Sequence, residues 1–361
     1  MNTKEIIDKI KSLVSSPIGA KAKPNHAPES VLSCDLGKSK MVFLEILKSP
    51  SGMELVQFQK IIRPTDETKL AEVLSQTRQS SNFGTSKVRL SIKGQGVVVR
   101  FIQFPKMKPE ELRGALTFES EKYIPFKSEE VVIDYHIIEE DPSNAPGKLT
   151  SLLLVAVKKD EIYNLVKNFQ NAGFQVELID IDSLAFFNGL EFFHPEDCRS
   201  SVGLLDIGTD ISTLVITRSG MPRFIRDISF GGADLVKRLK RKLGMSEKEA
   251  FEQLEVDREP SQPAMEVLKE GIKSLVADFK VSVDYYMDQM QPPEGVKKLF
   301  LGGAAGYLPF VIKAFSEDLG FPVQSMDLGN KISIKQGLDQ DYIKKNQALL
   351  HVALGLCLRD L

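Results

Sequence analysis

Cysteine and histidine are scarce in this 361-residue chain, which contains three of the first and four of the second. Cys34, Cys198 and Cys357 stand alone without CxxC spacing, and the histidines are scattered along the sequence. A disulfide framework or a structural zinc site requires clustered ligands, so both are disfavoured. The distribution is typical of isolated thiols in a reducing compartment.

The chain also lacks long apolar runs and a large excess of one charge. No stretch of about 18 consecutive apolar residues is present to span a bilayer, and the N-terminal MNTKEIIDKIKSLVSS lacks the apolar segment of a secretory signal. The formal net charge of −2 provides no concentrated basic surface, which argues against nucleic acid as the main ligand. We therefore expect a globular protein of the cytoplasm.

A catalytic triad has little support in the sequence. The members of a triad converge only in the fold, so spacing alone leaves this class open. However, no GxSxG elbow is present to position a nucleophilic serine. The chain is 42% hydrophobic and long enough to form two or more lobes with cores of their own.

Residues 1–30 differ from the rest of the chain. Ile6, Ile7, Ile10 and Leu13 recur at helical spacing, which predicts a short amphipathic helix with lysines on the opposite face. The following SPIGAKAKPNHAPES has the composition of a linker. This segment is expected to dock on the body or to form a mobile tail, and contact with a membrane or partner is the alternative.

A strand-turn-strand pattern occurs twice. VLSCDLGKSKMVFLEI carries Asp35 and Gly37 after its first strand, and SVGLLDIGTDISTLVI carries Asp206 and Gly208 in the same places. Each copy is followed by an SGM turn, and the two acids are 206 − 35 = 171 residues apart. Solenoid repeats are only about 20 to 50 residues long. The duplication therefore predicts two related lobes of α/β structure.

The patterning divides the chain into segments. We expect residues 31–85 to begin the first lobe, 86–176 to form an inserted α+β subdomain, 177–200 to complete the first lobe, and 201–361 to form the second. Within the insertion, a Pro-Glu-Glu sequence predicts the start of a helix at residue 109. In the second lobe, the apolar spacing predicts one long helix over 265–290.

The paired acids and glycines have a chemical interpretation. An aspartate at a strand end can hold Mg²⁺ directly or through water, and glycine lets backbone N–H groups approach phosphate oxygens. An isolated Asp-x-Gly is most often only a turn. Two matched hairpins, followed by Gly231-Gly232 and by LGGAAGYLP at a helix start, favour a nucleotide held between facing lobes.

Six segments carry a resemblance: DLGKSK, LIDIDSLAF, LLDIGTDISTL, FGGADL, DFKVSVDYY and FLGGAAGYLP. Their order is similar to that of the actin-like ATPase superfamily. Within it the chain resembles the PilM family of type IV pilus assembly, and more distantly the FtsA cell-division family, over about residues 31–361. The resemblance implies an actin-like ATPase fold of class α/β, with two lobes around a nucleotide cleft and an inserted α+β subdomain in the first lobe.

The same resemblance implies roles for individual residues. Asp35 and Asp206 would hold Mg²⁺, directly or through water, and Asp182 would position the metal or the attacking water as a catalytic candidate. Lys38 stands where the family usually has Thr or Ser, and Asp278 where Glu is usual. The nucleotide-binding candidates are Asp35, Gly37, Lys38, Ser39 and Lys40 in the first phosphate loop; Asp206, Gly208, Thr209 and Asp210 in the second; Gly232, Asp278, Lys280 and Ser282 on the ribose and base side; and Gly302, Gly303 and Ala304 in the adenosine loop.

By this resemblance the protein would bind ATP or ADP with Mg²⁺ and hydrolyse ATP slowly or not at all. It would act as a scaffold at the cytoplasmic face of the inner membrane, with indirect membrane contact. The implied partners are the N-terminal cytoplasmic segment of a PilN-like membrane protein, in a groove beside the inserted subdomain, and the pilus motor, in support of twitching motility. Self-association is a further expectation.

Three alternatives stay open at this stage. An FtsA-like cytoskeletal protein would end in an amphipathic membrane-binding helix, whereas this sequence ends in an apolar one. A type II secretion adaptor would share most features of the pilus adaptor. A sugar or acetate kinase of the same superfamily would need an acid beside its acceptor hydroxyl, and no substrate motif of that kind is evident.

Overall fold

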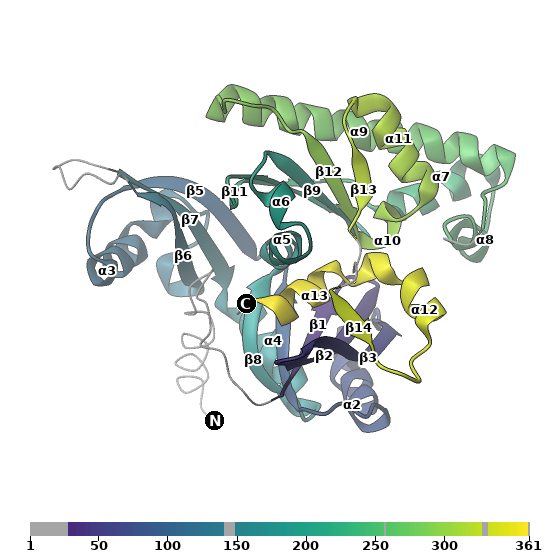
Figure 1. The fold of residues 1–361 in the computed structure, drawn as a ribbon, viewed down its shortest axis with the longest axis horizontal. Coiled ribbons are helices and arrows are strands. Elements are labelled where there is room, and N and C mark those ends of the chain that lie inside the picture. Colours follow the sequence, from purple (N-terminus) through teal and green to yellow (C-terminus); the bar gives the residue numbers. More distant parts are fainter. Residues whose placement is uncertain (1–27, 141–148, 256–257, 327–330, 360–361) are drawn as a thin grey trace.

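Three β-sheets with helices between and around them form the framework (Figure 1). The computed structural model describes residues 28–140, 149–255, 258–326 and 331–359. The amphipathic helix predicted near the N-terminus, with nearly all of its linker, lies outside the described residues. Strand β1 already begins at Glu29.

The largest sheet has six strands. β1 pairs antiparallel with β2 and parallel with β4, and β4 pairs parallel with β8. In spatial order the strands are β14 (Ile332–Ile334), β3 (Gly52–Ile62), β2 (Lys40–Ser49), β1 (Glu29–Leu36), β4 (Lys87–Ile92) and β8 (Gln175–Ile181).

A five-stranded sheet repeats this plan. β9 pairs antiparallel with β10 and parallel with β12, as β1 does with β2 and β4. The predicted SGM turns join the second and third strand of each copy, where Gly52, Ser219 and Gly220 have positive φ. The duplication read from the sequence is therefore present in the fold. In spatial order the strands are β11 (Met221–Ile228), β10 (Ser212–Arg218), β9 (Val202–Ile207), β12 (Lys298–Gly302) and β13 (Val323–Ser325).

A smaller antiparallel sheet lies beside both larger ones. It consists of β5 (Val97–Pro105), β7 (Leu149–Lys158) and β6 (Val131–Glu140), in that spatial order. The helices are α2 (Leu70–Ser80), α3 (Pro109–Glu119), α4 (Lys159–Asn171), α5 (Asp182–Phe193), α6 (Pro195–Cys198), α7 (Gly232–Leu243), α8 (Glu247–Glu252), α9 (Gln262–Met290), α10 (Gly303–Gly306), α11 (Pro309–Leu319), α12 (Gln340–Lys345) and α13 (His351–Leu358), with 3₁₀ turns η1 (Glu67–Lys69), η2 (Ser120–Lys122), η3 (Ser128–Glu130) and η4 (Gln347–Leu349).

The observed segment boundaries differ from the predicted ones. β4 and β8 pair within the six-stranded sheet, so the insertion comprises about residues 93–158 and is shorter than the predicted 86–176. α4 belongs with the first lobe, because its apolar face packs into the core shared with β1 and β4. The second lobe is also shorter than 201–361, since β14 pairs with β3 of the first sheet.

The last helix explains this return to the first lobe. Every residue of α13 is buried, so the helix has no face that water would solvate and must be enclosed. It lies with α5 between the two large sheets, in a core that includes Phe58, Phe186, Leu204 and Phe300 (Figure 1). α13 and α5 therefore connect the lobes.

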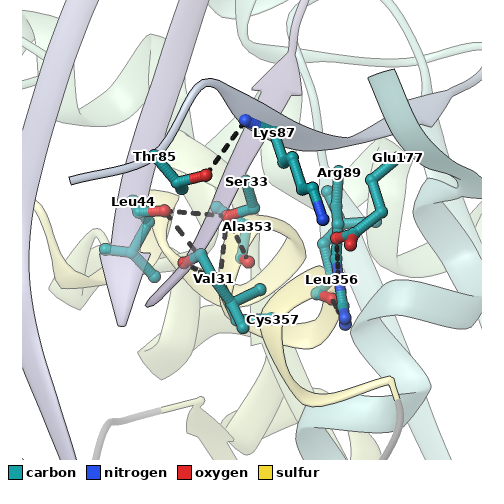
Figure 2. Close-up of polar contacts among 10 residues, drawn as sticks. All are labelled: Val31, Ser33, Leu44, Thr85, Lys87, Arg89, Glu177, Ala353, Leu356 and Cys357. Atoms are coloured by element: carbon teal, nitrogen blue, oxygen red, sulfur yellow. Dashed lines mark hydrogen bonds and ion pairs between the residues drawn. The ribbon is translucent and has the colours of Figure 1, made fainter. Parts of the chain in front are cut away.

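Buried polar contacts fix α13 on the six-stranded sheet (Figure 2). The Ser33 hydroxyl donates to the carbonyl of Ala353 at 2.7 Å, and the Arg89 guanidinium donates to the carbonyl of Leu356 at 3.3 Å. The last four carbonyls of a helix lack intrahelical donors, so the contact from Arg89 satisfies a buried acceptor in the last turn, while Ser33 adds a second donor to the carbonyl of Ala353.

All three cysteines are buried free thiols. Among the described residues, no helix combines the length and the apolarity needed to cross a bilayer. The one helix of sufficient length, α9, covers the outer face of the five-stranded sheet and packs against α7 and α11. Its bounds agree with the long helix predicted over 265–290.

Two helical glycines test the packing of α13. A Cβ at Gly355 would lie 1.6 Å from the carbonyl oxygen of Ala185 in α5, whereas a Cβ at Gly114 in α3 would meet no atom within 4 Å. We expect Gly355→Ala to destabilise the protein by about 3 kcal/mol or more, because two backbones must separate. Gly114→Ala should instead stabilise it by about 0.5–1 kcal/mol. Urea denaturation measures both, and equal midpoints for the two variants would contradict this packing.

Candidate functional site

The carboxyl ends of the parallel strands of both large sheets point to one place between the lobes. β1, β4 and β8 bring Asp35, Lys93 and Asp182 there, and β9 brings Asp206 from the other sheet. His351, the first residue of α13, completes this group. We call Asp35, Lys93, Asp182, Asp206 and His351 the cleft cluster. Crevices at the carboxyl ends of parallel strands are where open α/β sheets bind ligands.

Lys93 lies among the three carboxylates. Its ammonium nitrogen is 2.5 Å from Asp182 Oδ2 and 3.9 Å from Asp206 Oδ2. Burial alone would lower the pKa of Lys93, but the charges of Asp182, Asp35 and Asp206 outweigh it and raise the pKa. The side chain is 38% exposed, so solvent reaches the cluster on this side.

Asp206 is paired with His351 inside the protein. Nε2 of His351 is 3.1 Å from Asp206 Oδ1, and its Nδ1 accepts a hydrogen bond from the Gly303 N–H at 3.4 Å. An accepting Nδ1 assigns the ring proton to Nε2, which then donates to Asp206. Burial would raise the pKa of Asp206, but His351 and Lys93 hold it down to about 2. The carboxylate is therefore charged at neutral pH.

Asp35 is the least satisfied member of the cluster. Its Oδ1 is buried, and within the described part of the chain it has no hydrogen-bond partner. Burial is the main reason that the pKa of Asp35 rises to about 7, and the negative charges of Asp182 and Asp206 raise it further. Lys93 and His351 act in the opposite direction and lower it. Asp35 and Asp206 thus lie close enough to influence each other, as the paired hairpins predicted.

The two hairpins also touch directly. The hydroxyls of Ser39 and Thr209 are 2.9 Å apart, and Lys38 Nζ lies 3.9 Å from Asp210 Oδ2. Among the residues that the structure describes, the backbone N–H groups of these four residues donate no hydrogen bond. Two facing loops with unpaired N–H groups have the chemistry of an anion site.

Close backbone packing shapes the hairpins. A Cβ at Gly37 would lie 2.9 Å from the carbonyl oxygen of Lys40, and one at Gly208 would lie 2.6 Å from that of Ile211. The N–H of Gly232, at the start of α7, donates to Gly208 O at 2.9 Å. The structure therefore places Gly232 against the second hairpin, where its N–H is already used. Burial and the nearby Lys60 lower the pKa of Lys40 in the first hairpin.

The predicted adenosine loop lies at the end of β12. A Cβ at Gly302 would come within 2.9 Å of His351 and Phe186, and one at Gly303, where φ is +78°, would come within 2.6 Å of Asp206 Oδ1. Glycine is required at both positions because a side chain there would collide with members of the cleft cluster. The next residue, Ala304, is exposed on α10.

The predicted ribose and base residues on α9 are not brought to the cluster. Lys280 pairs with Asp318 at 2.9 Å, and the Ser282 hydroxyl donates to the carbonyl of Asp278 within the helix. Asp318 lies nine residues along α11 from Pro309, which is about 14 Å of helix. This part of α9 therefore lies beside the end of α11 that is distant from Gly303, and the assignment of Asp278, Lys280 and Ser282 to the ribose and base side stays a prediction.

Two members of the cluster were missed in the sequence. Lys93 directly follows a buried strand and precedes Gly94-Gln95-Gly96, but the Asp-x-Gly pattern that marked Asp35 and Asp206 does not include a lysine. His351 stands alone at the start of an apolar helix. The signal available in the sequence for Lys93 was a charged residue between an apolar strand and Gly94-Gln95-Gly96.

The cleft cluster fits a magnesium ion with phosphates. Three carboxylates against one ammonium leave net negative charge, and carboxylate oxygens are ligands that Mg²⁺ prefers. The unpaired Oδ1 of Asp35 lacks the partner that a buried oxygen requires. Asp35, Asp182 and Asp206 would hold the ion, while the N–H groups of the two hairpins would face the phosphates.

A cavity lies between the inserted sheet and β8, and we call it the β6–β8 pocket. Asp134 and His136 of β6 line one side, Ile179 and Asp180 of β8 the other, and Arg359 lies at its border. Arg359 pairs with Asp180 at 3.0 Å, and both side chains are nearly inaccessible. Among the described residues, His136 Nε2 has no hydrogen-bond partner. Ile92, Tyr135, Val155, Val157, Ile181 and Leu184 complete the lining.

The raised pKa of Asp35 predicts a pH-dependent stability. A carboxyl with pKa about 7 when folded and 3.8 when unfolded holds its proton more tightly in the folded protein, so its contribution is lost as pH rises from about 4 to about 7. Relative to Asp35→Asn, the ligand-free wild type should lose up to ~4 kcal/mol over this window. Denaturant unfolding across pH measures the difference.

The exposed carboxylate Asp284 on α9 provides the control for this measurement. Asp284→Asn should follow the wild-type pH profile. If Asp35→Asn also runs parallel to wild type between pH 4 and 8, the crowding of carboxylates around Asp35 is contradicted.

Known proteins share this architecture. A chain of a PilM–PilN type IV pilus biogenesis complex superimposes with a TM-score of 0.81 at 20% identity, covering 91% of this chain and 98% of that one. The ethanolamine utilization protein EutJ from Carboxydothermus hydrogenoformans matches with a TM-score of 0.54 at 12% identity, over 98% and 97% of the two chains. MreB5 of Spiroplasma citri bound to ADP matches with a TM-score of 0.51 at 11% identity, over 91% and 94%.

The actin-like ATPase fold predicted from the sequence is confirmed by these structures. The family model described as type IV pilus assembly protein PilM matches residues 53–361, from the second residue of β3 to the end of the chain. The match includes the second hairpin, Asp182 and α13, while the first hairpin precedes it. On these findings, the chain belongs to the family of the type IV pilus assembly protein PilM.

Proposed function

We propose that this protein is a nucleotide-binding scaffold of type IV pilus assembly, and that its cleft cluster holds ATP or ADP with Mg²⁺. The observation that carries the proposal is the convergence of Asp35 and Asp206 from duplicated hairpins, with an unpaired buried oxygen on Asp35. Bound ADP in the MreB5 structure of similar fold supports the choice of nucleotide.

Each hairpin has a defined role in this proposal. The N–H groups of Lys38, Ser39, Thr209 and Asp210 donate to phosphate oxygens, and the carboxylates of the cluster bind the metal. Lys93 adds a positive charge beside the phosphates. The Ser39–Thr209 contact, at 2.9 Å, is replaced when phosphate enters between the hairpins.

Turnover is slow or absent in this proposal. A general base must be able to accept a proton from the attacking water. The carboxylate of Asp182, the predicted catalytic candidate, is bound to the Lys93 ammonium at 2.5 Å, so this oxygen is already occupied by another partner. Asp182 therefore positions the metal or water, and the bound nucleotide stabilises one arrangement of the lobes.

The partner segment is assigned to the β6–β8 pocket. The similar structure contains PilN, and we propose that an N-terminal cytoplasmic segment of a PilN-like membrane protein binds beside the inserted subdomain. β6 and β8 are both edge strands of their sheets, and edge strands bind extended segments through backbone hydrogen bonds. The pocket between them offers an apolar lining with the polar groups of Asp134 and His136.

This partner places the protein at the cytoplasmic face of the inner membrane, where it links the membrane protein to the pilus motor and, through it, to twitching motility. Membrane contact is indirect in this arrangement, since the PilN-like protein supplies the anchor. Self-association is part of the same proposal, because a scaffold that joins several components needs more than one interaction surface.

Substitution of Asp206 tests the nucleotide site. Asp206→Asn keeps an oxygen that accepts from His351 but removes the charge that faces metal and phosphate, so we expect affinity for ATP with Mg²⁺ to fall at least about 10-fold. Isothermal titration calorimetry measures it. The control is Asp227→Asn, on β11 of the same sheet, where the carboxylate accepts from Thr213. Equal affinities in wild type and Asp206→Asn would reject the site.

Filling the β6–β8 pocket tests the partner site. His136→Trp adds bulk to the cavity and should weaken binding of a synthetic N-terminal segment of the PilN-like protein at least about 10-fold. Fluorescence anisotropy with the labelled segment measures the affinity, and circular dichroism verifies the fold. Lys313→Trp, on the exposed face of α11, is the matched control. Unchanged binding to His136→Trp would exclude this pocket.

A further inference from the structure

The β6–β8 pocket has an apolar lining with two polar groups that an incoming ligand can engage. Among the described residues, His136 Nε2 has no hydrogen-bond partner. Burial lowers the pKa of His136, so the ring is neutral at pH 7 and one of its nitrogens is an acceptor. Asp134 faces Arg113 at 3.7 Å, a long contact to a side chain that is 54% exposed. The pocket therefore suits an apolar ligand that also brings a donor or a positive charge.

One segment of this chain has both properties. Residues 1–27 precede the described part of the chain, and the spacing of Ile6, Ile7, Ile10 and Leu13 predicts an apolar helix face there. Five lysines against two acidic residues give this segment a formal charge of +3, which leaves −5 for residues 28–361 of a chain whose total is −2. The segment and the body are thus complementary in charge.

The segment is attached within reach of the pocket. Cys34 of β1 is level with Leu90 of β4, and Leu90 is level with Ile179 in the pocket lining. Ile179 therefore lies five residues along and two strands across from Glu29, where β1 begins, which is a distance of about 20 Å. Residues 15–28, between the predicted helix and β1, extend to about 46 Å.

The short connection also favours the contact thermodynamically. A ligand tethered by a linker of this length has an effective concentration in the range of about 1 mM. A weak intrinsic affinity of the segment for the pocket is therefore sufficient to keep most molecules in the docked state. A separate partner, present at lower concentration, has to compete with it.

We propose that residues 4–14 of this chain occupy the β6–β8 pocket as an amphipathic helix until the partner segment displaces them. The isoleucine face packs on the aliphatic lining, and a lysine side chain reaches from the rim of that face to Asp134 and His136. Insertion of an apolar helix face into a groove is a recurring mode of recognition. The displacement rests on the partner site proposed above, whereas the docking does not.

Tryptophan fluorescence tests the docking, because the chain contains no tryptophan. Ile10→Trp in the full chain places the only indole on the apolar face, and Ile18→Trp places it in the linker as a control. We expect emission at shorter wavelength from Ile10→Trp than from Ile18→Trp, independent of protein concentration. This difference should be lost when His136→Arg is added, because the longer side chain fills the pocket and repels lysine.

Two further variants make the pocket assignment specific. Gln289→Arg, at an exposed position of α9, should leave the emission of Ile10→Trp unchanged. If circular dichroism shows that His136→Arg does not fold, His136→Cys replaces it. Combined with Ile10→Cys, it should form a disulfide under mild oxidation faster than when combined with Ile18→Cys.

Competition is measured with the labelled partner segment. Replacement of Ile6 and Ile10 together by Asp removes the apolar face without touching the body. This variant should bind the partner segment at least about 5-fold more tightly than wild type, because docking no longer lowers the fraction of open pockets. Ile18→Asp should keep the wild-type affinity. Addition of the partner segment should also move the emission of Ile10→Trp to longer wavelength.

The outcomes separate this proposal from the partner site. Equal emission from Ile10→Trp and Ile18→Trp, or no response to the His136 variants, overturns the docking. Burial of the indole that depends on protein concentration assigns the segment to a second copy, and burial that requires phosphatidylglycerol vesicles assigns it to a membrane, so either also overturns it. The partner site then stands on its own test. A docked indole that the bound partner segment does not displace overturns the competition and excludes the partner from this pocket.

Discussion

Repulsion among three carboxylates is the constraint on which the centre of this protein depends. Asp35, Asp182 and Asp206 come from two lobes, and the carboxyl ends of parallel strands direct them to one place. The Lys93 ammonium offsets part of that charge, and the neutral ring of His351 donates a hydrogen bond to Asp206. The remaining negative charge makes the cluster suited to a divalent cation.

The same constraint explains the place of the C-terminal helix. α13 is apolar on every side and carries one polar residue, His351, to the one carboxylate that belongs to the second lobe. Its other end is followed by Arg359, which offsets the buried Asp180 beside the inserted sheet. One short helix thus satisfies buried acids in two regions, which gives the cleft cluster and the β6–β8 pocket a common structural element.

Much of this architecture could be predicted from the sequence, and the parts that could not have identifiable causes. The hairpins at Asp35 and Asp206 were predictable because a glycine turn after a buried strand is local chemistry. The strands on either side of Lys93 look alike as sequence, and only pairing assigns β4 to the large sheet and β5 to the small one. Lys93 and His351 act through partners distant in the chain, so the sequence around each of them does not reveal the contact.

We propose above all that Asp35, Asp182 and Asp206 together hold the metal of a bound nucleotide. The most direct measurement is a crystal structure grown with Mn²⁺ and a non-hydrolysable ATP analogue, in which anomalous scattering locates the metal. We expect a manganese peak among these three carboxylates, with phosphates between the hairpins. A nucleotide bound elsewhere, or a metal peak remote from Asp35 and Asp206, would contradict it.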